Sequence, residues 1–418
     1  MIDLKRLRDE PEYRRGIERK RVRAGLLDEL LALDERRRAL HTTVQDLRAR
    51  QNAASKEIGR ASADQRADKI AAAGALKDEL ATEEERLATL ETECDALALQ
   101  VPNPAHESVP DGGEDEGTVL REVGGPLRAA PARDHAEFGE RIGFFDRDRA
   151  AEVSGSRFAY LMREAVLLEL AIVQWVMSKL VGEGFIPVMP PVLVREQTMV
   201  EAGFFPTDRA QVYEVDGGEL FLVGTAEIPL SVLHRNEIIG ADELPLRYAG
   251  ASPCFRREAG TYGKDTRGIF RVHQFDKVEM FVFAEPDRSW EEHERILAIE
   301  ESIIGGLGLP YRVVNIAAGD LGNAAAKKYD LEVWLPSEGR YREVTSCSNY
   351  LDYSARRLGT RVKGERGTLP LHTLNGTACA ISRTLVYLFE HYQEPDGGIR
   401  VPEVLQPNTG FARVDPRG

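Results

Sequence analysis

Two runs of apolar residues at heptad spacing constrain the first hundred residues more than any other feature of the sequence. In each run the apolar positions follow intervals of four and three residues, which is the pattern of a helical coiled coil. The first run comprises Leu26, Leu30, Leu33, Leu40, Val44, Leu47, Ala54 and Ile58. The second comprises Ala73, Leu76, Leu80, Leu87, Leu90, Cys94, Leu97 and Val101. Because residues 59–68 interrupt the register, we predict two helices of about 33 residues each, forming an antiparallel hairpin on the order of 50 Å long.

The composition changes after the second run. Residues 101–117, VPNPAHESVPDGGEDEG, are rich in proline, glycine and acidic side chains, which indicates an interdomain linker. Beyond it, helices and strands alternate irregularly, so we predict an α+β fold with an antiparallel sheet flanked by helices rather than a doubly wound parallel sheet. We expect helices near 156–182 and 378–393, and strands at 184–194, 220–223, 246–258, 268–283, 311–316, 330–335 and 341–347. The predicted domains are an N-terminal helical domain at 1–102, a linker at 103–118 and a second domain at 119–418.

Charge and cysteine content narrow the class of protein. The net charge of −14 argues against general nucleic-acid binding, although basic residues cluster at 14–23 and 36–38. The four cysteines lie far apart, which indicates neither a disulfide framework nor a zinc site, so the cytoplasm is the expected compartment. The N-terminus is charged, and the longest apolar stretch, 165–177, contains Glu169 and is too short to span a bilayer. We therefore expect no membrane insertion.

Charges of both signs fill a predicted hairpin at residues 255–280. Because side chains alternate across a strand, Arg256 and Glu258 share one face of the first strand. One face of the second strand carries Arg271, His273, Phe275, Lys277 and Glu279. The loop between the strands combines glycines with Lys264 and Arg267, a composition suited to closing over phosphates. A solvated strand face explains these residues equally well when they are taken alone.

A second cluster, TAE at 225–227, offers two interpretations. In an extended segment Thr225 and Glu227 present a hydroxyl and a carboxylate to one ligand ammonium group. Alternatively, Thr225 caps the start of a helix.

In a third cluster Glu343 and Ser346 differ in strand parity, so they reach one site only if a bulge or turn intervenes near Thr345. Together they would supply the oxygen ligands that Mg²⁺ accepts.

The last cluster, at 372–393, predicts a turn followed by a helix. Asn375 is expected to end the turn with Gly376, and Thr377 to cap the helix. Its buried stripe comprises Ile381, Leu385, Leu388 and Tyr392. Arg383 lies about 200° around the helix from Ile381, so it points away from that stripe.

In this order, these stretches resemble class II aminoacyl-tRNA synthetases, and specifically the bacterial type of seryl-tRNA synthetase. The resemblance covers nearly the whole chain. It comprises the coiled-coil arm, GFIPVMPPVLV at 184–194 with Pro191 at the place of the dimer-forming motif 1, TAE at 225–227, the charged hairpin as motif 2, SCSN at 346–349, and motif 3 ending in Arg383. It implies a serine–tRNA ligase that forms seryl-adenylate from serine and ATP and transfers the seryl group to tRNA(Ser), with tRNA(Sec) as a further candidate substrate.

The resemblance also implies roles for individual residues. The catalytic set would be Arg256, Arg271 and Arg383. The serine-binding set would be Thr225, Ala226, Glu227, Arg256, Glu279, Asn375 and Thr377. The ATP-binding set would be Arg256, Arg257, Glu258, Arg271, Val272, Phe275, Glu343, Val344, Thr345, Ser346 and Arg383. Adenine would lie between Phe275 and Arg383, and Mg²⁺ would be held by Glu343 and Ser346.

The implied partners are tRNA, through the N-terminal arm, and a second copy of the chain, through the region around Pro191. Periodicity alone favours a structural or dimerising coiled coil for the arm. Three features depart from the commonest family pattern: Arg257, where serine is frequent, Ser382 before Arg383, and the C-terminal VLQPNTGF. The alternatives are a relative that passes serine to a carrier protein or biosynthetic intermediate, a specialised second copy of the enzyme, and a catalytically inactive coiled-coil adaptor.

Overall fold

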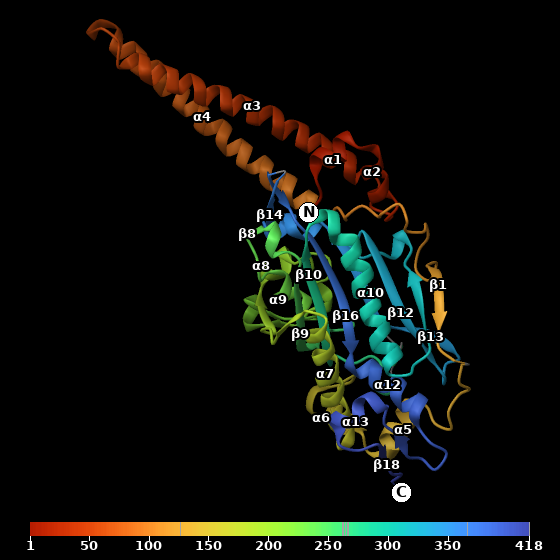
Figure 1. Cartoon of the computed structure of the whole chain (residues 1–418). Helices are drawn as coiled ribbons and strands as arrows, with labels where there is room; N and C mark the ends of the chain where they lie inside the picture. The colour runs from red at the N-terminus through yellow and green to blue at the C-terminus, as the bar shows by residue number, and fades with distance from the viewer. Residues whose placement is uncertain (126, 261–262, 264, 266, 366, 418) are drawn as a thin grey trace. The chain divides into compact units, whose positions relative to one another are not determined.

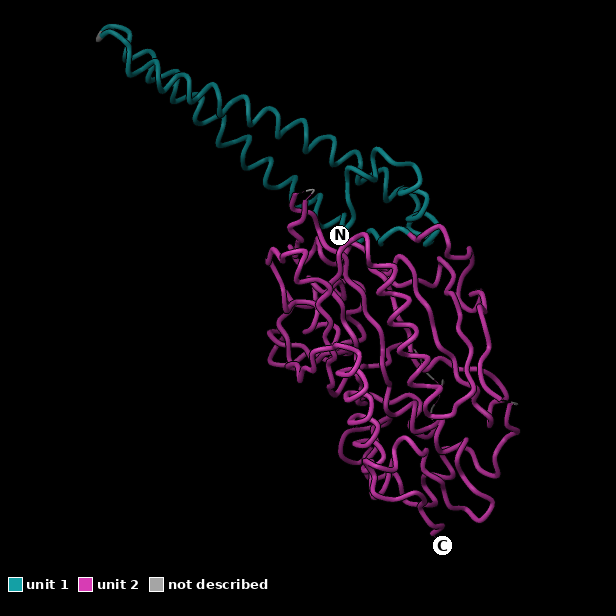
Figure 2. The backbone as a smooth tube through the Cα atoms, in the orientation of Figure 1, with its two compact units in different colours: residues 1–104 teal, residues 105–418 magenta. Residues whose placement is uncertain are grey.

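Two units, Met1–Pro104 and Ala105–Gly418, make up the fold (Figure 2). The structure, a computed structural model, describes residues 1–417 apart from 126, 261, 262, 264, 266 and 366. Part of the segment predicted as a linker packs within the second unit, since Ala105 and Val109 are buried in a cluster with Val314 and Ile316. The Asn315 side chain also donates to the carbonyl oxygen of Ser108 at 2.9 Å. This segment is therefore part of a folded unit rather than a free connection.

The first unit is helical, as the heptad pattern predicts. Its helices are α1 (Leu4–Asp9), α2 (Pro11–Glu18), α3 (Leu26–Ile58) and α4 (Ala63–Ala98). The two long helices, α3 and α4, pack against each other as the predicted hairpin (Figure 1). Predicted seam residues Val44, Leu47, Leu80 and Leu87 are buried between them. The interruption is shorter than predicted, because α4 already begins at Ala63.

An eight-stranded sheet organises the second unit (Figure 1). Its strands, in spatial order, are β1 (Thr118–Val123), β11 (Tyr311–Asn315), β12 (Lys327–Leu335), β13 (Arg340–Leu351), β16 (His372–Ala380), β10 (Gln274–Ala284), β9 (Leu246–Phe255) and β4 (Ile186–Val188). Every neighbouring pair is antiparallel except β4 with β9. The predicted α+β class with an antiparallel sheet is thus confirmed.

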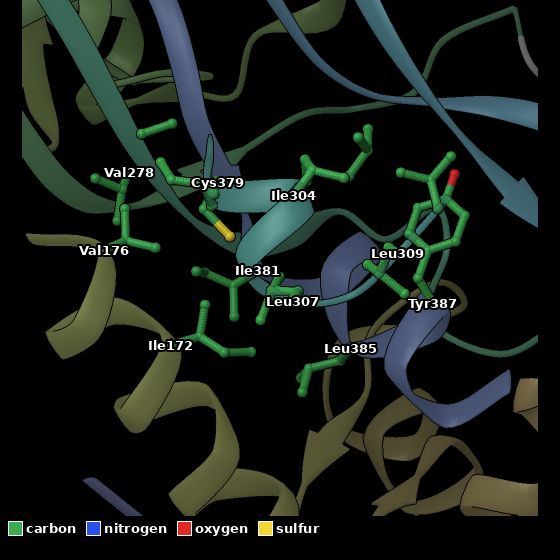
Figure 3. Packing of buried hydrophobic residues seen from close by; sticks show 14 of the residues in the cluster. Ile172, Val176, Val278, Ile304, Leu307, Leu309, Cys379, Ile381, Leu385 and Tyr387 are labelled. Atoms are coloured by element: carbon green, nitrogen blue, oxygen red, sulfur yellow. The ribbon is translucent and has the colours of Figure 1, made fainter. Parts of the chain in front are cut away.

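Three helices, α7 (Glu164–Gly182), α10 (Ser289–Gly306) and α12 (Ile381–Tyr392), pack in one core with alternate residues of the central strands. Figure 3 shows Ile172 and Val176 of α7 beside Val278 of β10 and Ile381 of α12. Because side chains alternate, one face of each strand enters this core, and the opposite face of β10 carries Phe281 and Phe283 in a smaller apolar cluster before it becomes polar toward Lys277. The polar face holds the site described below.

Smaller elements surround the large sheet. They are α5 (His135–Ile142), β2 (Phe145–Asp146), α6 (Arg147–Ser154), β3 (Tyr160–Leu161), β5 (Leu193–Arg195), α8 (Glu196–Glu201), β6 (Glu214–Val215), β7 (Leu220–Leu222), α9 (Glu227–Ser231), β8 (Ile238–Gly240), α11 (Tyr353–Leu358), β14 (Arg361–Gly364), β15 (Gly367–Pro370), β17 (Ile399–Arg400), α13 (Gln406–Thr409) and β18 (Arg413–Val414). The strand predicted at 184–194 is in fact divided between β4 and β5.

Helix α10 was not predicted from the sequence. Its buried face includes Glu292, His293 and Glu300, all less than 5% exposed. These polar residues interrupt the apolar stripe by which an amphipathic helix is recognised. The helix therefore depends on polar partners supplied by the sheet.

Helix α7 begins at Glu164, later than the predicted start at 156, and runs for 19 residues with a mean hydropathy of 1.6. By length and composition it is long enough to cross a membrane, contrary to the expectation from residues 165–177 alone. In this fold, however, its Leu168, Ile172 and Val176 are buried in the core of the second unit. Its outer face leaves Leu167 and Leu170 exposed.

Candidate active site

The polar face of the sheet lines a cavity of ≈ 480 Å³. On β16 the alternation is clear: Leu374 and Ala378 lie in the helix-covered core, whereas Asn375 and Thr377 line the cavity. A side chain added at Gly376 would collide with Ile296 of α10, so this position faces the helix. Successive side chains of this part of β16 therefore face the core and the cavity in turn.

Most of the predicted site residues meet in this cavity. They are Thr225, Glu227, Arg256, Glu258, Arg271, Val272, Phe275, Glu279, Glu343, Val344, Ser346, Asn375, Thr377 and Arg383. Three predicted residues lie outside its lining. Ala226 is buried in a small apolar cluster, Arg257 is exposed, and Thr345 points toward α10, where its hydroxyl donates to Glu300 at 3.2 Å.

Several residues predicted to lie in strands follow or precede them instead. Strand β9 ends at Phe255 and β10 begins at Gln274, so Arg256, Glu258 and Arg271 lie in the connecting loop. Glu258 has a φ of 50°, a left-handed conformation that ends the extended chain.

Ion pairs hold this connecting loop together. Arg271 donates from Nη1 to Glu258 at 2.5 Å, and its Nε lies 3.4 Å from Asp265. Of the two cations expected to close over phosphates, Lys264 lies outside the described residues, and Arg267 pairs with Asp134 at 3.1 Å.

Arginines and aromatic rings alternate along the cavity wall. Arg256 donates from Nε to the Gly224 carbonyl oxygen at 3.2 Å, and its guanidinium carbon lies 5.4 Å from the centroid of Phe275. Arg383 donates to the Glu343 carbonyl oxygen at 3.1 Å, and its guanidinium carbon lies 5.2 Å from the centroid of Phe270. As predicted, Arg383 points away from the buried stripe of α12. Planar cations and rings at these separations suit a flat, anionic ligand.

The bulge expected near Thr345 is present. Strand β12 pairs Leu331 with Thr345 and then Glu332 with Glu343, which leaves Val344 as the additional residue. This register shift brings Glu343 and Ser346 to the same cavity.

The negative charge of Glu343 suits a residue that binds a metal cation. Partial desolvation would raise the pKa of this carboxyl, although its side chain is still 48% exposed, but the positive charges of Arg383 and Lys328 outweigh that effect and lower it. An ionised carboxylate beside a hydroxyl is a donor set that suits Mg²⁺.

Helix α9 begins at Glu227 with Ala226 at its N-cap position, and Thr225 lies just before the cap. The Glu227 backbone N–H donates to Thr225 Oγ1 at 3.2 Å, so the extended interpretation of this segment is wrong, although both side chains still line the cavity. The carboxylate of Glu227 accepts from the Tyr350 hydroxyl at 2.7 Å and from Asn375 Nδ2 at 2.9 Å. Burial, followed by the nearby charge of Glu279, raises the pKa of Glu227 to about 7.

Asn375 and Thr377 lie within β16, so the predicted turn and helix cap are wrong. Strand β16 pairs with β10 on one side and β13 on the other, and these long-range hydrogen bonds override the local Asn-Gly turn signal. Both side chains contact Glu279: Asn375 Nδ2 donates to its Oε1 at 3.3 Å, and Thr377 donates to its Oε2 at 3.4 Å. Lys277 forms an ion pair with the same Oε2.

Sequence reasoning assigned no role to several other residues that line the cavity. They include Asp208, Phe270, Lys277, Lys328, Ser348, Tyr350 and Ser382. Ser348 and Tyr350 continue the two-residue alternation that starts at Ser346, so extending that pattern along the strand would have found them. No pattern in the neighbouring sequence indicates that Asp208 or Lys328 lines the cavity.

Comparison with known proteins agrees with this geometry. Residues 1–105 match the family model of the seryl-tRNA synthetase N-terminal domain, and residues 212–392 match that of the tRNA synthetase class II core domain (G, H, P, S and T). The chain is 46% identical over 416 residues to serine–tRNA ligase 1 of Streptomyces avermitilis and 47% identical over 413 residues to serine–tRNA ligase of Thermobifida fusca. Each alignment covers 98% of both chains.

Solved structures give the same result. Seryl-tRNA synthetase from Pyrococcus horikoshii complexed with ATP superposes with a TM-score of 0.94 at 38% identity, covering 100% of both chains. Cytoplasmic serine–tRNA ligase from Naegleria fowleri in complex with AMP gives a TM-score of 0.90 at 32% identity, covering 100% of this chain and 99% of the other.

Proposed function

The chain belongs to the seryl-tRNA synthetase family, and we propose that the cavity of its second unit binds ATP and serine side by side. The protein is an ATP-dependent serine–tRNA ligase: it activates serine to seryl-adenylate and transfers the seryl group to the 3′ end of tRNA. The observation that carries the assignment of the site is the convergence of Arg256, Glu279 and Arg383 on one cavity. This convergence argues against an inactive adaptor.

ATP would occupy the part of the cavity lined by arginines and aromatic rings. Adenine lies between Phe275 and Arg383, with its amino group on Glu258. Arg256 contacts the α-phosphate, and Arg271 exchanges its ion pair with Glu258 for a contact to the γ-phosphate. Glu343 and Ser346 would hold Mg²⁺, which neutralises charge on the phosphates.

Serine would bind at the two buried carboxylates. Its ammonium group lies beside Thr225 and Glu227, and its hydroxyl contacts Glu279 and Thr377. The substrate carboxylate attacks the α-phosphorus and the bond to the β-phosphate breaks, which releases pyrophosphate, so the step needs no nucleophile from the protein. Arg256 and Arg271 contribute by positioning ATP in line and by neutralising the charge that develops on phosphorus.

The N-terminal domain is the tRNA-binding arm. We propose that its exposed arginines contact the phosphates of tRNA(Ser), including the long variable arm, and that the same surface accepts tRNA(Sec). We further propose a homodimer formed through the region around Pro191, since this part of the chain exposes the apolar residues Ile186, Met189 and Leu193. The cytoplasm is the compartment where these substrates meet.

Amino-acid-dependent exchange of pyrophosphate into ATP tests this site. With the wild-type protein we expect activation of serine to exceed that of alanine by up to about 10,000-fold, because alanine leaves the buried polar groups unpaired. Threonine keeps the hydroxyl, so its rejection reports a steric wall instead. Thr377→Val should lower serine activation, whereas an equal response to serine and alanine would overturn the assignment of Glu279 and Thr377.

A further inference from the structure

The serine cluster contains two buried carboxylates with different partners. Glu227 accepts hydrogen bonds from two neutral groups, the Tyr350 hydroxyl and the Asn375 amide. Glu279 shares the Asn375 amide but also forms an ion pair with Lys277, whose side chain is only 7% exposed. The cluster is therefore asymmetric in charge.

The backbone forces this ion pair. Lys277 and Glu279 are two residues apart on β10, so both side chains point to the cavity, while Val278 between them enters the apolar core. The pairing with β16 shifts register between Val278 and Glu279, which places Thr377 directly opposite Glu279. As a result, Oε2 of Glu279 contacts both Lys277 and Thr377.

Serine brings one cation and one hydroxyl to these two carboxylates. A carboxylate without a cationic partner would attract the substrate ammonium group most strongly. Lys277 pairs directly with Glu279 and acts on Glu227 only at longer range, so Glu227 is the carboxylate that the substrate ammonium group can pair with. An ionised Glu279 accepts hydrogen bonds only, and it therefore requires a donor such as the serine hydroxyl.

We propose that Lys277 is a positioning residue that determines which carboxylate receives each group of the substrate. Its ion pair reserves Glu279 for the side-chain hydroxyl and directs the α-ammonium group to Glu227. This inference rests on the proposed binding of serine by Glu227 and Glu279. It also implies that the wild-type site excludes an amino acid whose side chain carries a cation in place of the hydroxyl.

The test uses the full-length protein and L-2,3-diaminopropionate, in which an amino group replaces the hydroxyl of serine. Pyrophosphate exchange is measured below neutral pH, where both amino groups of this compound are protonated. Lys277→Met should lower kcat/KM for serine by about 10- to 100-fold and shift the ratio of diaminopropionate to serine activation upward by about tenfold or more. Lys277→Arg should restore most of the serine preference, and the KM for ATP should change little in both variants.

Lys327→Met is the matched control, because Lys327 lies in β12 of the same sheet, does not line the cavity, and contacts Tyr329 instead. It should leave the amino-acid ratio unchanged. The variant Glu279→Gln distinguishes a failure of the proposed serine site from a failure of the proposed role of Lys277. If it leaves serine activation intact, the proposed role of Glu279 fails. If it lowers serine activation while Lys277→Met leaves the ratio unchanged, only the role of Lys277 fails.

Removing one partner of a buried ion pair destabilises a fold, so thermal unfolding of each variant accompanies the kinetics. A further measurement, made on the wild-type protein, tests the proposal even if Lys277→Met does not fold. Diaminopropionate should inhibit serine activation no better than alanine does. An inhibition constant for diaminopropionate as low as the KM for serine would show that Glu279 accepts a cation, and would overturn the proposal.

Discussion

The arm and the active-site cavity use charged residues in opposite ways. In the arm, Arg48 of α3 pairs with Glu84 of α4 at 2.8 Å, and both side chains are exposed, by 58% and 39%. In the cavity, the side chains of Lys277 and Glu279 are 7% and 0% exposed. Water and salt screen the first kind of pair, whereas the second kind cannot be separated without leaving a buried charge. Each exposed ion pair of the arm therefore contributes little to stability, whereas the buried pair in the cavity is costly to break.

Deleting residues 26–100 gives the largest expected separation between the two regions. The seam of the hairpin is buried between α3 and α4 themselves, so its removal should leave pyrophosphate exchange largely intact. Transfer of serine to tRNA should be abolished, because the phosphate contacts of the arm are lost. Equal loss of exchange and transfer would contradict a separate tRNA-binding role for the arm.

Arg256→Ala should reduce serine-dependent exchange by about 100- to 1000-fold, the usual effect of removing one donor to a charged transition state. Arg257→Ala is the matched control, because its side chain is exposed and outside the cavity lining. We expect this variant to retain near wild-type exchange. A similar loss in both variants would mean that Arg257 contributes to ATP binding after all.

Salt should affect the two regions differently. For two or more phosphate contacts, a fourfold rise in salt concentration should weaken tRNA binding at least about tenfold. The KM for serine should change far less, since buried charges are screened weakly. Filter binding of tRNA and exchange kinetics across the same salt series measure both effects. An affinity for tRNA that does not change with salt concentration would contradict an electrostatic role for the arm.

The pH dependence of serine binding should report Glu227, whose pKa is raised to about 7. Its ionised form binds the ammonium group, so affinity should be complete above that pKa and fall about tenfold for each pH unit below it. Calorimetry in buffers of different ionisation enthalpy should detect proton release on serine binding below this pKa. Glu227→Gln should weaken binding and remove this pH dependence; an unchanged profile would assign the titration to another group.

The smallest expected effect is that of Arg48→Ala in the arm. An exposed ion pair contributes about 0.2–1 kcal/mol to the free energy of unfolding, so the change in stability should lie within that range. A double-mutant cycle with Glu84→Ala measures the pair itself. A coupling much above about 1 kcal/mol would show that the arm also depends on individual charges.

The motifs that resemble a known family identified residues that line one cavity, whereas the predictions of local structure failed where local signals competed with long-range pairing. The Asn375-Gly376 turn signal was misleading because both residues pair with two neighbouring strands. Helix α10 was missed because Glu292, His293 and Glu300 occupy its buried face. Lys277 was visible on the charged face, but its ion pair with Glu279 became evident only in the folded sheet.

The amino-acid sequence by itself determined the coiled-coil arm, the antiparallel α+β class and the family, because heptad spacing, strand alternation and motifs are properties of neighbouring residues. Only the tertiary structure decided how the polar groups of the cavity are paired. Asn375 contacts Glu227 across 148 positions of the chain and Glu279 across 96. Contacts over such separations follow from strand order and register, and therefore exist only once the sheet has formed.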